Sequence, residues 1–129
     1  MSTDKIDIKD FSNDHTTRGI WHSLHRTAFK AQDRSDVVVI YAFTLMFVKD
    51  MICKVCNTHA KQFISETGYI VDILQDQNIT DSEVIDAFNK WLYEFHKTAN
   101  KHANKTSPSY EDVAEFYLQL EVCLEGCGH

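Results

Sequence analysis

The sequence predicts an all-α fold, in the form of a four-helix bundle with a short fifth helix. Helix breakers are sparse, since 129 residues include only four Gly and one Pro, and this suits long helices with short connections. Apolar residues recur every three to four positions through most of the chain, which is the spacing of one face of a helix. The length fits a single domain with its own core.

The first two predicted helices differ in how apolar they are. Residues 16–31 read as an amphipathic helix with one apolar face. Its second face is aromatic and basic, and carries Arg18, Trp21, His25 and Phe29. After a capping signal at Asp33 and Ser35, the chain is almost wholly apolar over residues 37–49. This run predicts a helix that is buried on most sides.

The third and fourth helices are predicted from their ends. The third is expected over residues 53–67, with Gly68 as its C-terminal cap. Thr80 and Glu83 form a capping box that begins the fourth helix. The apolar stripe of that helix consists of Val84, Phe88, Trp91, Leu92, Phe95 and Ala99.

The fifth helix is expected to begin at Pro108 and Ser109. Its apolar stripe consists of Val113, Phe116, Tyr117 and Leu120. Residues 69–78 receive no clear assignment. We expect a domain over residues 15–121, with a flexible N-terminal tail at residues 1–14 and a C-terminal tail at residues 122–129.

Charge and hydropathy argue against two classes of partner. The formal net charge is −6 with a pI near 5.5, and basic residues are scattered, which argues against nucleic acid. The best candidate for a membrane span, residues 37–48, is shorter than the ~20 residues that a bilayer requires. Residues 1–14 resemble neither a secretory signal nor a transit peptide, so the chain is expected to stay where it is translated.

All four cysteines fall in two close pairs. Cys53 and Cys56 form a C-x-x-C at a predicted helix start, where a disulfide can close with little backbone movement. The helix N-terminus and Lys54 favour the reactive thiolate there. Cys123 and Cys127 follow the last helical stripe. A mobile disulfide at that position would be able to carry electrons to the fixed pair.

Other uses of these cysteines stay open. Free cysteines are often only small buried hydrophobes, although two tight pairs among four argue against that. The stronger alternative is a zinc site with four cysteine ligands, to which His59 would also be a candidate ligand. A thioredoxin-like site requires a βαβ pattern, and the sequence predicts no strands.

A dithiol needs a cofactor to pass its electrons efficiently to oxygen. Flat and cationic side chains recur at helical spacing in two of the predicted helices: Trp21 with His25, and His96 with Asn100, with Trp91 and Lys105 near by. Side chains of these types suit a dinucleotide, which combines flat rings with two phosphates.

These residues resemble the motifs of the Erv/ALR family of FAD-linked sulfhydryl oxidases, especially the compact forms carried by large DNA viruses. Residues 18–28 fit the W-x-x-L-H-x-x-A of the family, and residues 53–59 fit its C-x-x-C-x-x-H. Residues 91–105 are similar to its W-L-x-x-x-H-N-x-V-N with a later Lys. Order and spacing agree across residues 18–117.

The resemblance implies a homodimeric flavoenzyme with FAD bound within the helical bundle. Cys56 would lie against the isoalloxazine, and Cys53 would exchange with the dithiol of a protein substrate or of a thioredoxin-like relay protein. Electrons would pass through FAD to oxygen and give hydrogen peroxide. Cys123 and Cys127 would correspond to the shuttle pair of the family, and no metal is expected.

The resemblance also implies which residues line the cofactor: Arg18, Gly19, Trp21, His25, His59, Trp91, His96, Asn100 and Lys105. It further implies a compartment in which disulfides are made. With no targeting segment, we expect host cytoplasm or virion for a viral protein, and the mitochondrial intermembrane space otherwise.

Four positions depart from the pattern of the family. Ile52 replaces the usual Pro before the first cysteine, and Ala60 replaces the Phe after the motif His. Lys97 replaces the usual Asn, and Ala99 the usual Val. None of these changes removes a group that performs chemistry. The alternative from another functional class is a helical interaction module with a four-cysteine zinc site and no catalysis.

Overall fold

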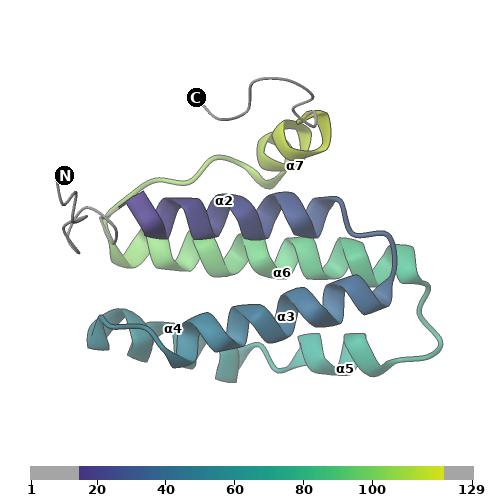
Figure 1. Cartoon of the computed structure of the whole chain (residues 1–129), viewed down its shortest axis with the longest axis horizontal. Coiled ribbons are helices and arrows are strands. Elements are labelled where there is room, and N and C mark those ends of the chain that lie inside the picture. Colours follow the sequence, from purple (N-terminus) through teal and green to yellow (C-terminus); the bar gives the residue numbers. More distant parts are fainter. Residues whose placement is uncertain (1–14, 121–129) are drawn as a thin grey trace, which may run out of the picture.

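The computed structural model describes residues 15–120 and confirms the all-α class. Within that range the chain forms helices and no strand (Figure 1). The helices are α2 (His15–Phe29), α3 (Arg34–Lys49), α4 (Lys54–Glu66), α5 (Tyr69–Gln75), α6 (Asp81–His102) and α7 (Tyr110–Gln119). The two predicted tails, residues 1–14 and 122–129, lie outside the described residues.

The longest helix, α6, packs against four of the others. It contacts α2, α3, α4 and α5, whereas α7 packs on α2. Figure 1 shows α2 and α6 side by side, with α3 next to them, α4 and α5 on the far side and α7 on the opposite side. The core lies around α6, which buries Val84, Phe88, Trp91, Leu92 and Phe95. The predicted stripe of this helix is therefore its core face, up to Phe95.

Three helix starts are capped by the residues that the sequence predicts. The Asp33 side chain accepts a hydrogen bond from the Asp36 N–H at the start of α3. Thr80 and Glu83 form both hydrogen bonds of a capping box at the start of α6. Ser109 accepts from the Asp112 N–H at the start of α7. Each cap satisfies a backbone N–H that the first helical turn leaves free.

The prediction that Gly68 caps the third helix is wrong. The C-cap of α4 is Thr67, and Gly68 has φ −59°, which is right-handed helical backbone rather than the left-handed conformation of a glycine cap. Gly68 instead leads directly into α5, which the sequence analysis left unassigned. This helix has only seven residues and buries Ile70 and Leu74, so it is too short to show a clear period.

The prediction that α3 is buried on most sides is also wrong. Its buried residues, Val37, Ile40, Thr44 and Val48, form one face. The other side leaves four large apolar side chains exposed: Val38, Val39, Phe43 and Met46. An apolar run shows how much apolar surface a helix could bury. It does not show how many other helices of the same chain pack against it. No helix within residues 15–120 is long and apolar enough to cross a membrane.

Arg34 holds the connection between α5 and α6. Its guanidinium donates to the carbonyls of Leu74 (3.1 Å), Asp76 (2.7 Å) and Ile79. It also lies 3.6 Å from the Asp81 carboxylate, and its side chain is largely buried. One charged group therefore satisfies the Leu74 carbonyl in the last turn of α5 and two carbonyls that follow this helix.

Replacing Arg34 by Ala should lower the free energy of unfolding by about 2–3 kcal/mol, because these carbonyls lose a charged donor. Lys90→Ala is the matched control, since it removes an exposed cation whose ion pair with Asp86 joins residues one turn apart. It should cost about 0.5 kcal/mol or less. Urea unfolding measures both values. Equal losses in the two variants would contradict the role of Arg34.

Candidate functional site

The start of α4 holds the C-x-x-C pair. Cys53 is the N-cap residue, and its Sγ accepts the Cys56 N–H at 3.2 Å. The Asn57 side-chain amide donates to the Val48 carbonyl, which ties the start of α4 to the end of α3. Both cysteines are exposed free thiols. The pair is therefore accessible and lies on a fixed helix start.

The two thiols differ in their affinity for a proton. The pKa of Cys53 is lowered, first by a hydrogen bond from the Cys56 thiol and then by the backbone N–H groups of Cys56 and Val55. The pKa of Cys56 is raised, chiefly because its thiol donates to Cys53, with smaller effects of burial and of the charge on Cys53. Cys53 is thus the first to become a thiolate, as helix-start geometry favours.

Three of the predicted cofactor residues come together between α2 and α6. His25 Nε2 lies 2.9 Å from His96 Nδ1, within hydrogen-bond distance. The ring of Trp21 stacks on His96, with 4.2 Å between centroids and an angle of 1°. Trp21 also stacks on His25 at 5.9 Å. The helical spacing of Trp21 and His25 brings both onto the same partner residue.

Burial keeps both imidazoles neutral. It lowers the pKa of His25 to about 3, with further effects of His96 and His22, and His25 is only 2% exposed. Burial also lowers the pKa of His96 to about 4, assisted by the charge of Lys105. The Nδ1 atom of His25 is buried and has no hydrogen-bond partner. A buried polar atom without a partner is costly and is a reason to consider a ligand.

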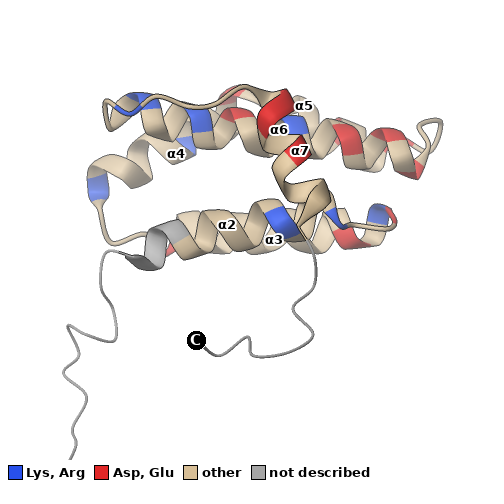
Figure 2. Cartoon of the chain, turned by 90° about the horizontal axis from the view of Figure 1, so that it is seen from above, with Lys and Arg blue, Asp and Glu red and all other residues tan. Residues whose placement is uncertain are grey.

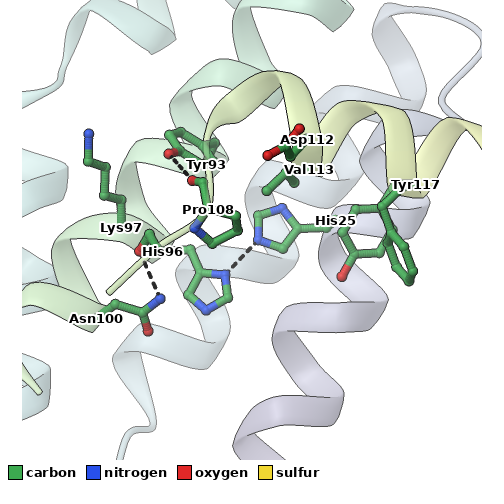
Figure 3. A pocket seen from close by; sticks show the side chains of 11 residues that line it. His25, Tyr93, His96, Lys97, Asn100, Pro108, Asp112, Val113 and Tyr117 are labelled. Atoms are coloured by element: carbon green, nitrogen blue, oxygen red, sulfur yellow. Dashed lines mark hydrogen bonds between the residues drawn. The ribbon is translucent and has the colours of Figure 1, made fainter. Parts of the chain in front are cut away.

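A cavity of about 360 Å³ adjoins this pair of histidines (Figure 3). Residues of α2, α6, α7 and the α6–α7 connection line it: His25, Tyr93, His96, Lys97, Asn100, Ser107, Pro108, Asp112, Val113, Phe116 and Tyr117. Figure 3 shows His25 and His96, which both line the cavity, joined by a hydrogen bond. The Asn100 side-chain amide donates to Ser107 Oγ at 3.0 Å. The size is typical of a site for a small molecule or for part of a larger one.

The C-terminal turn of α6 brings Asn100 and Lys105 to the same region. Asn104 has φ 58°, a left-handed conformation that Asn tolerates. The Lys105 N–H then reaches back to the Asn100 carbonyl at 2.7 Å, and the Asn104 N–H to that of Lys101 at 3.1 Å. The chain reverses after α6, and Lys105 lies close enough to His96 to influence its pKa.

The remaining predicted residues lie elsewhere. His59 stacks on His102, with centroids 3.6 Å apart, and so joins α4 to the end of α6. Trp91 is fully buried in the core, where its indole N–H donates to Thr67 Oγ1 at 2.9 Å. Gly19 is exposed on α2, with open space where a side chain would be.

Three predicted positions are not described at the level of side chains. Arg18 belongs to α2, but its side chain lies outside the described part of the structure, and Cys123 and Cys127 lie outside residues 15–120. Within the described residues, no group of three or more His, Cys, Asp or Glu is arranged to hold a metal ion.

The sequence analysis missed the contribution of α7 to the site. Tyr117 lies 5.5 Å from His25 between ring centroids, stacks on Phe29 at 5.9 Å, and its hydroxyl is 3.1 Å from His22 Nδ1. Tyr117 belongs to the predicted apolar stripe of α7. Such a stripe does not show against which other helix α7 packs. His102 was also missed, because only its stacking on His59 distinguishes it.

Charge is unevenly distributed around the site. Figure 2 shows acidic positions on α7 and the first half of α6, and basic positions at the end of α6 and the start of α4. Lys97 and Lys101 lie on the last turns of α6, and Lys54 opens α4. The end of the molecule that carries the cysteine pair is therefore more basic than the net charge of −6 suggests.

Comparison of the chain with models of protein families, with curated proteins and with solved structures finds no match. The resemblance to the Erv/ALR family therefore depends on the three sequence motifs and on the residues that they contain. The family assignment and the activity that it implies are treated below as proposals.

Proposed function

We propose that this chain is an FAD-dependent thiol oxidase that introduces disulfide bonds into protein substrates. The observation that carries the proposal is the convergence of Trp21, His25 and His96 around a buried, unpartnered Nδ1 atom, beside a cavity of about 360 Å³. The same small domain presents a C-x-x-C pair whose two thiols have opposite pKa shifts.

The residues around the cavity fit the chemistry of FAD. Flat rings at His25 and Tyr117, which line the cavity, and at Trp21, which stacks on His25, suit stacking on a flat ring system. His25 Nδ1 offers a hydrogen-bonding atom that has no partner. Lys97 lines the cavity and Lys105 is close enough to His96 to lower its pKa, and these two cations suit the pyrophosphate. When bound, the flavin would accept two electrons and two protons from the reduced cysteine pair and pass them to oxygen, giving hydrogen peroxide.

The role of the cysteine pair is disulfide exchange. A substrate thiolate attacks Cys53 Sγ of the Cys53–Cys56 disulfide, the S–S bond breaks, and Cys56 leaves as a thiolate. The second substrate thiolate then attacks the mixed disulfide and displaces Cys53. The substrate has lost two electrons and gained a disulfide, and the enzyme pair is reduced. Cys56, whose pKa is raised, takes up a proton after the first step. The hydrogen bonds from its thiol and from the backbone N–H groups then lower the Cys53 pKa and make Cys53 a good leaving group in the second step.

We further propose that the all-α fold is a four-helix bundle, which is the fold expected for this function. The four main helices would be α2, α3, α4 and α6, with α7 as the short fifth and α5 as an addition. Cys123 and Cys127 are proposed as a shuttle pair that accepts electrons from a substrate protein or a thioredoxin-like relay. Host cytoplasm or a virion is the proposed site of action if the chain is viral, and the mitochondrial intermembrane space otherwise.

The exposed apolar side of α3 supports the homodimer. Val39, Phe43 and Met46 follow one another at helical spacing and are all exposed. A contiguous patch of this kind is rare on a monomer.

We expect Phe43→Glu to convert a dimer to monomers in analytical ultracentrifugation, because each interface would bury two unpaired carboxylates. Lys90→Glu, on an exposed part of α6, is the control, and an unchanged dimer in Phe43→Glu would contradict this interface.

Oxygen uptake tests the activity directly. The purified chain, supplied with FAD and an excess of a small dithiol, should consume oxygen and form hydrogen peroxide in equal molar amounts. Oxygen uptake should require both FAD and the dithiol. A chain that binds FAD but consumes no oxygen with any dithiol would contradict the proposed function.

A further inference from the structure

The cysteine pair is bordered by exposed apolar side chains. Ile52, directly before Cys53, is 98% exposed, Val55 is 65% exposed, and Met51 is also exposed. A single apolar residue on a surface is ordinary. Here three of them lie within five residues and on both sides of the same thiol, so they form a local apolar surface. We call Met51, Ile52 and Val55 the apolar rim.

The apolar rim is held beside Cys53 by the local structure. Cys53 Sγ accepts the Cys56 N–H at 3.2 Å, and the first turn of α4 is tied to α3 through Asn57 and the Val48 carbonyl. Ile52 and Val55 therefore lie just before and just after Cys53 on a fixed backbone, and both side chains are exposed. A polypeptide that brings its own sulfur to Cys53 approaches a surface on which these side chains are accessible.

The charges around the apolar rim are mainly positive. Lys49 precedes it and Lys54 lies between Ile52 and Val55; both lysines are exposed, and Asp50 is the one carboxylate in the connection between α3 and α4. The first turn of α4 has no acidic residue, and the N-terminus of a helix adds partial positive charge. This surface is complementary to a segment that is apolar next to its cysteine and carries carboxylates near by.

The size of the apolar rim favours a peptide segment over a second copy of the chain. A stable protein–protein interface buries roughly 800 Å² on each partner. Three side chains, two of them β-branched and of moderate size, supply only a small part of that area. An extended segment of a few residues matches the extent of the surface better.

We propose that the apolar rim is the substrate-docking surface of the oxidase, and that it binds extended cysteine-bearing segments with apolar and acidic neighbours. This inference rests on the proposed thiol oxidase function and names the class of its substrates. It predicts that partly folded proteins, in which such segments are exposed, are better substrates than small thiols or cysteines with polar and basic neighbours.

The test compares two synthetic dithiol peptides of equal length. In one, each cysteine has Val or Leu beside it and Glu near by; in the other, Ser and Lys occupy the same positions. Wild-type kcat/KM should be roughly tenfold higher for the first peptide, which corresponds to about 1.4 kcal/mol. The double variant Ile52→Ser, Val55→Ser should reduce this preference to near one. Leu118→Ser, at an exposed apolar residue of α7, is the matched control and should retain it.

The outcomes separate this inference from the oxidase function. Oxidation of dithiothreitol without any preference between the peptides would overturn the docking surface and leave the oxidase intact. If no dithiol is oxidised, binding of the apolar peptide with serines in place of its cysteines is followed by methyl NMR. Shifts at Ile52 and Val55 would then still support docking, and their absence would overturn it.

Two other occupants of the apolar rim would give different results in these experiments. A lower molecular mass of the Ile52→Ser, Val55→Ser variant in solution would assign the apolar rim to a second copy of the chain. The same loss of peptide preference in Leu124→Ser would assign it to the C-terminal segment of this chain. Either result would overturn the proposal.

Discussion

Replacing Cys56 by Ser should leave FAD bound but reduce dithiol oxidation by about a thousandfold or more, which is typical of the loss of an essential covalent group. The proposed exchange step needs a disulfide between Cys53 and Cys56, and the serine hydroxyl cannot form one. Cys53→Ser should have an equally large effect, because it removes the sulfur that the substrate would attack in the proposed mechanism. Absorbance of the bound flavin and oxygen uptake measure the two properties separately.

Thr58→Ala is the control for these cysteine variants. Thr58 is an exposed residue of the same helix, and its hydroxyl donates only to the Lys54 carbonyl within that helix. Its replacement should change oxygen uptake by less than about twofold, since surface changes of this kind cost little. Normal turnover in Cys56→Ser would remove the cysteine pair from the mechanism.

The free energy of unfolding should fall as the pH is lowered from 6.5 towards 4, because of His25 and His96. In the unfolded chain a histidine binds a proton near its ordinary pKa of 6.5, whereas burial holds the native pKa of His25 at about 3 and that of His96 at about 4. Between these values the unfolded state binds more protons, so stability decreases with falling pH. Above pH 6.5 the two histidines cause no such loss.

The size of the effect follows from the width of that interval. At pH 4 the cost of keeping His25 neutral is about 3 kcal/mol, as an order of magnitude, and partly exposed His96 adds less. Urea unfolding at roughly unit spacing, at about pH 4, 5, 6 and 7, measures the slope with which the free energy of unfolding changes with pH. His25→Gln should flatten it. A slope that His25→Gln leaves unchanged would show that this histidine is not buried in its neutral form.

A core variant supplies the matched control for the acid effect. Leu24 is buried on α2 next to His25 and has no proton to gain or lose. Leu24→Ala should lower stability by about 2–5 kcal/mol at every pH, without changing the slope. Comparison of the two variants separates a general loss of packing from the cost of buried neutral imidazoles.

The features that could be predicted from the sequence are those encoded over short distances. The capping residues Asp33, Thr80 and Ser109 act within one helical turn, so their roles are visible in the sequence. Trp21 and His25 lie one turn apart, and this spacing is sufficient to place both rings on the same side of α2. Their contact with His96 brings together residues of the first and third motifs.

The features that were missed depend on which helix packs where. Tyr117 reaches the site because α7 lies across α2, and His102 because the end of α6 lies beside α4. Neither arrangement follows from periodicity within one helix. The apolar sequence of α3 was interpreted as burial on most sides, although Phe43 and its neighbours on that face are exposed. Periodicity within one helix does not show how many other helices pack against it.

The most direct test of the oxidase is the visible absorption spectrum of the chain, purified without added cofactor, before and after a dithiol is added under air. The proposed function predicts a flavin band that bleaches on addition of the dithiol and returns once the dithiol has been consumed, with uptake of oxygen. A colourless protein that instead carries zinc would contradict it, and would reassign Cys53, Cys56, Cys123 and Cys127 as metal ligands of a non-catalytic module.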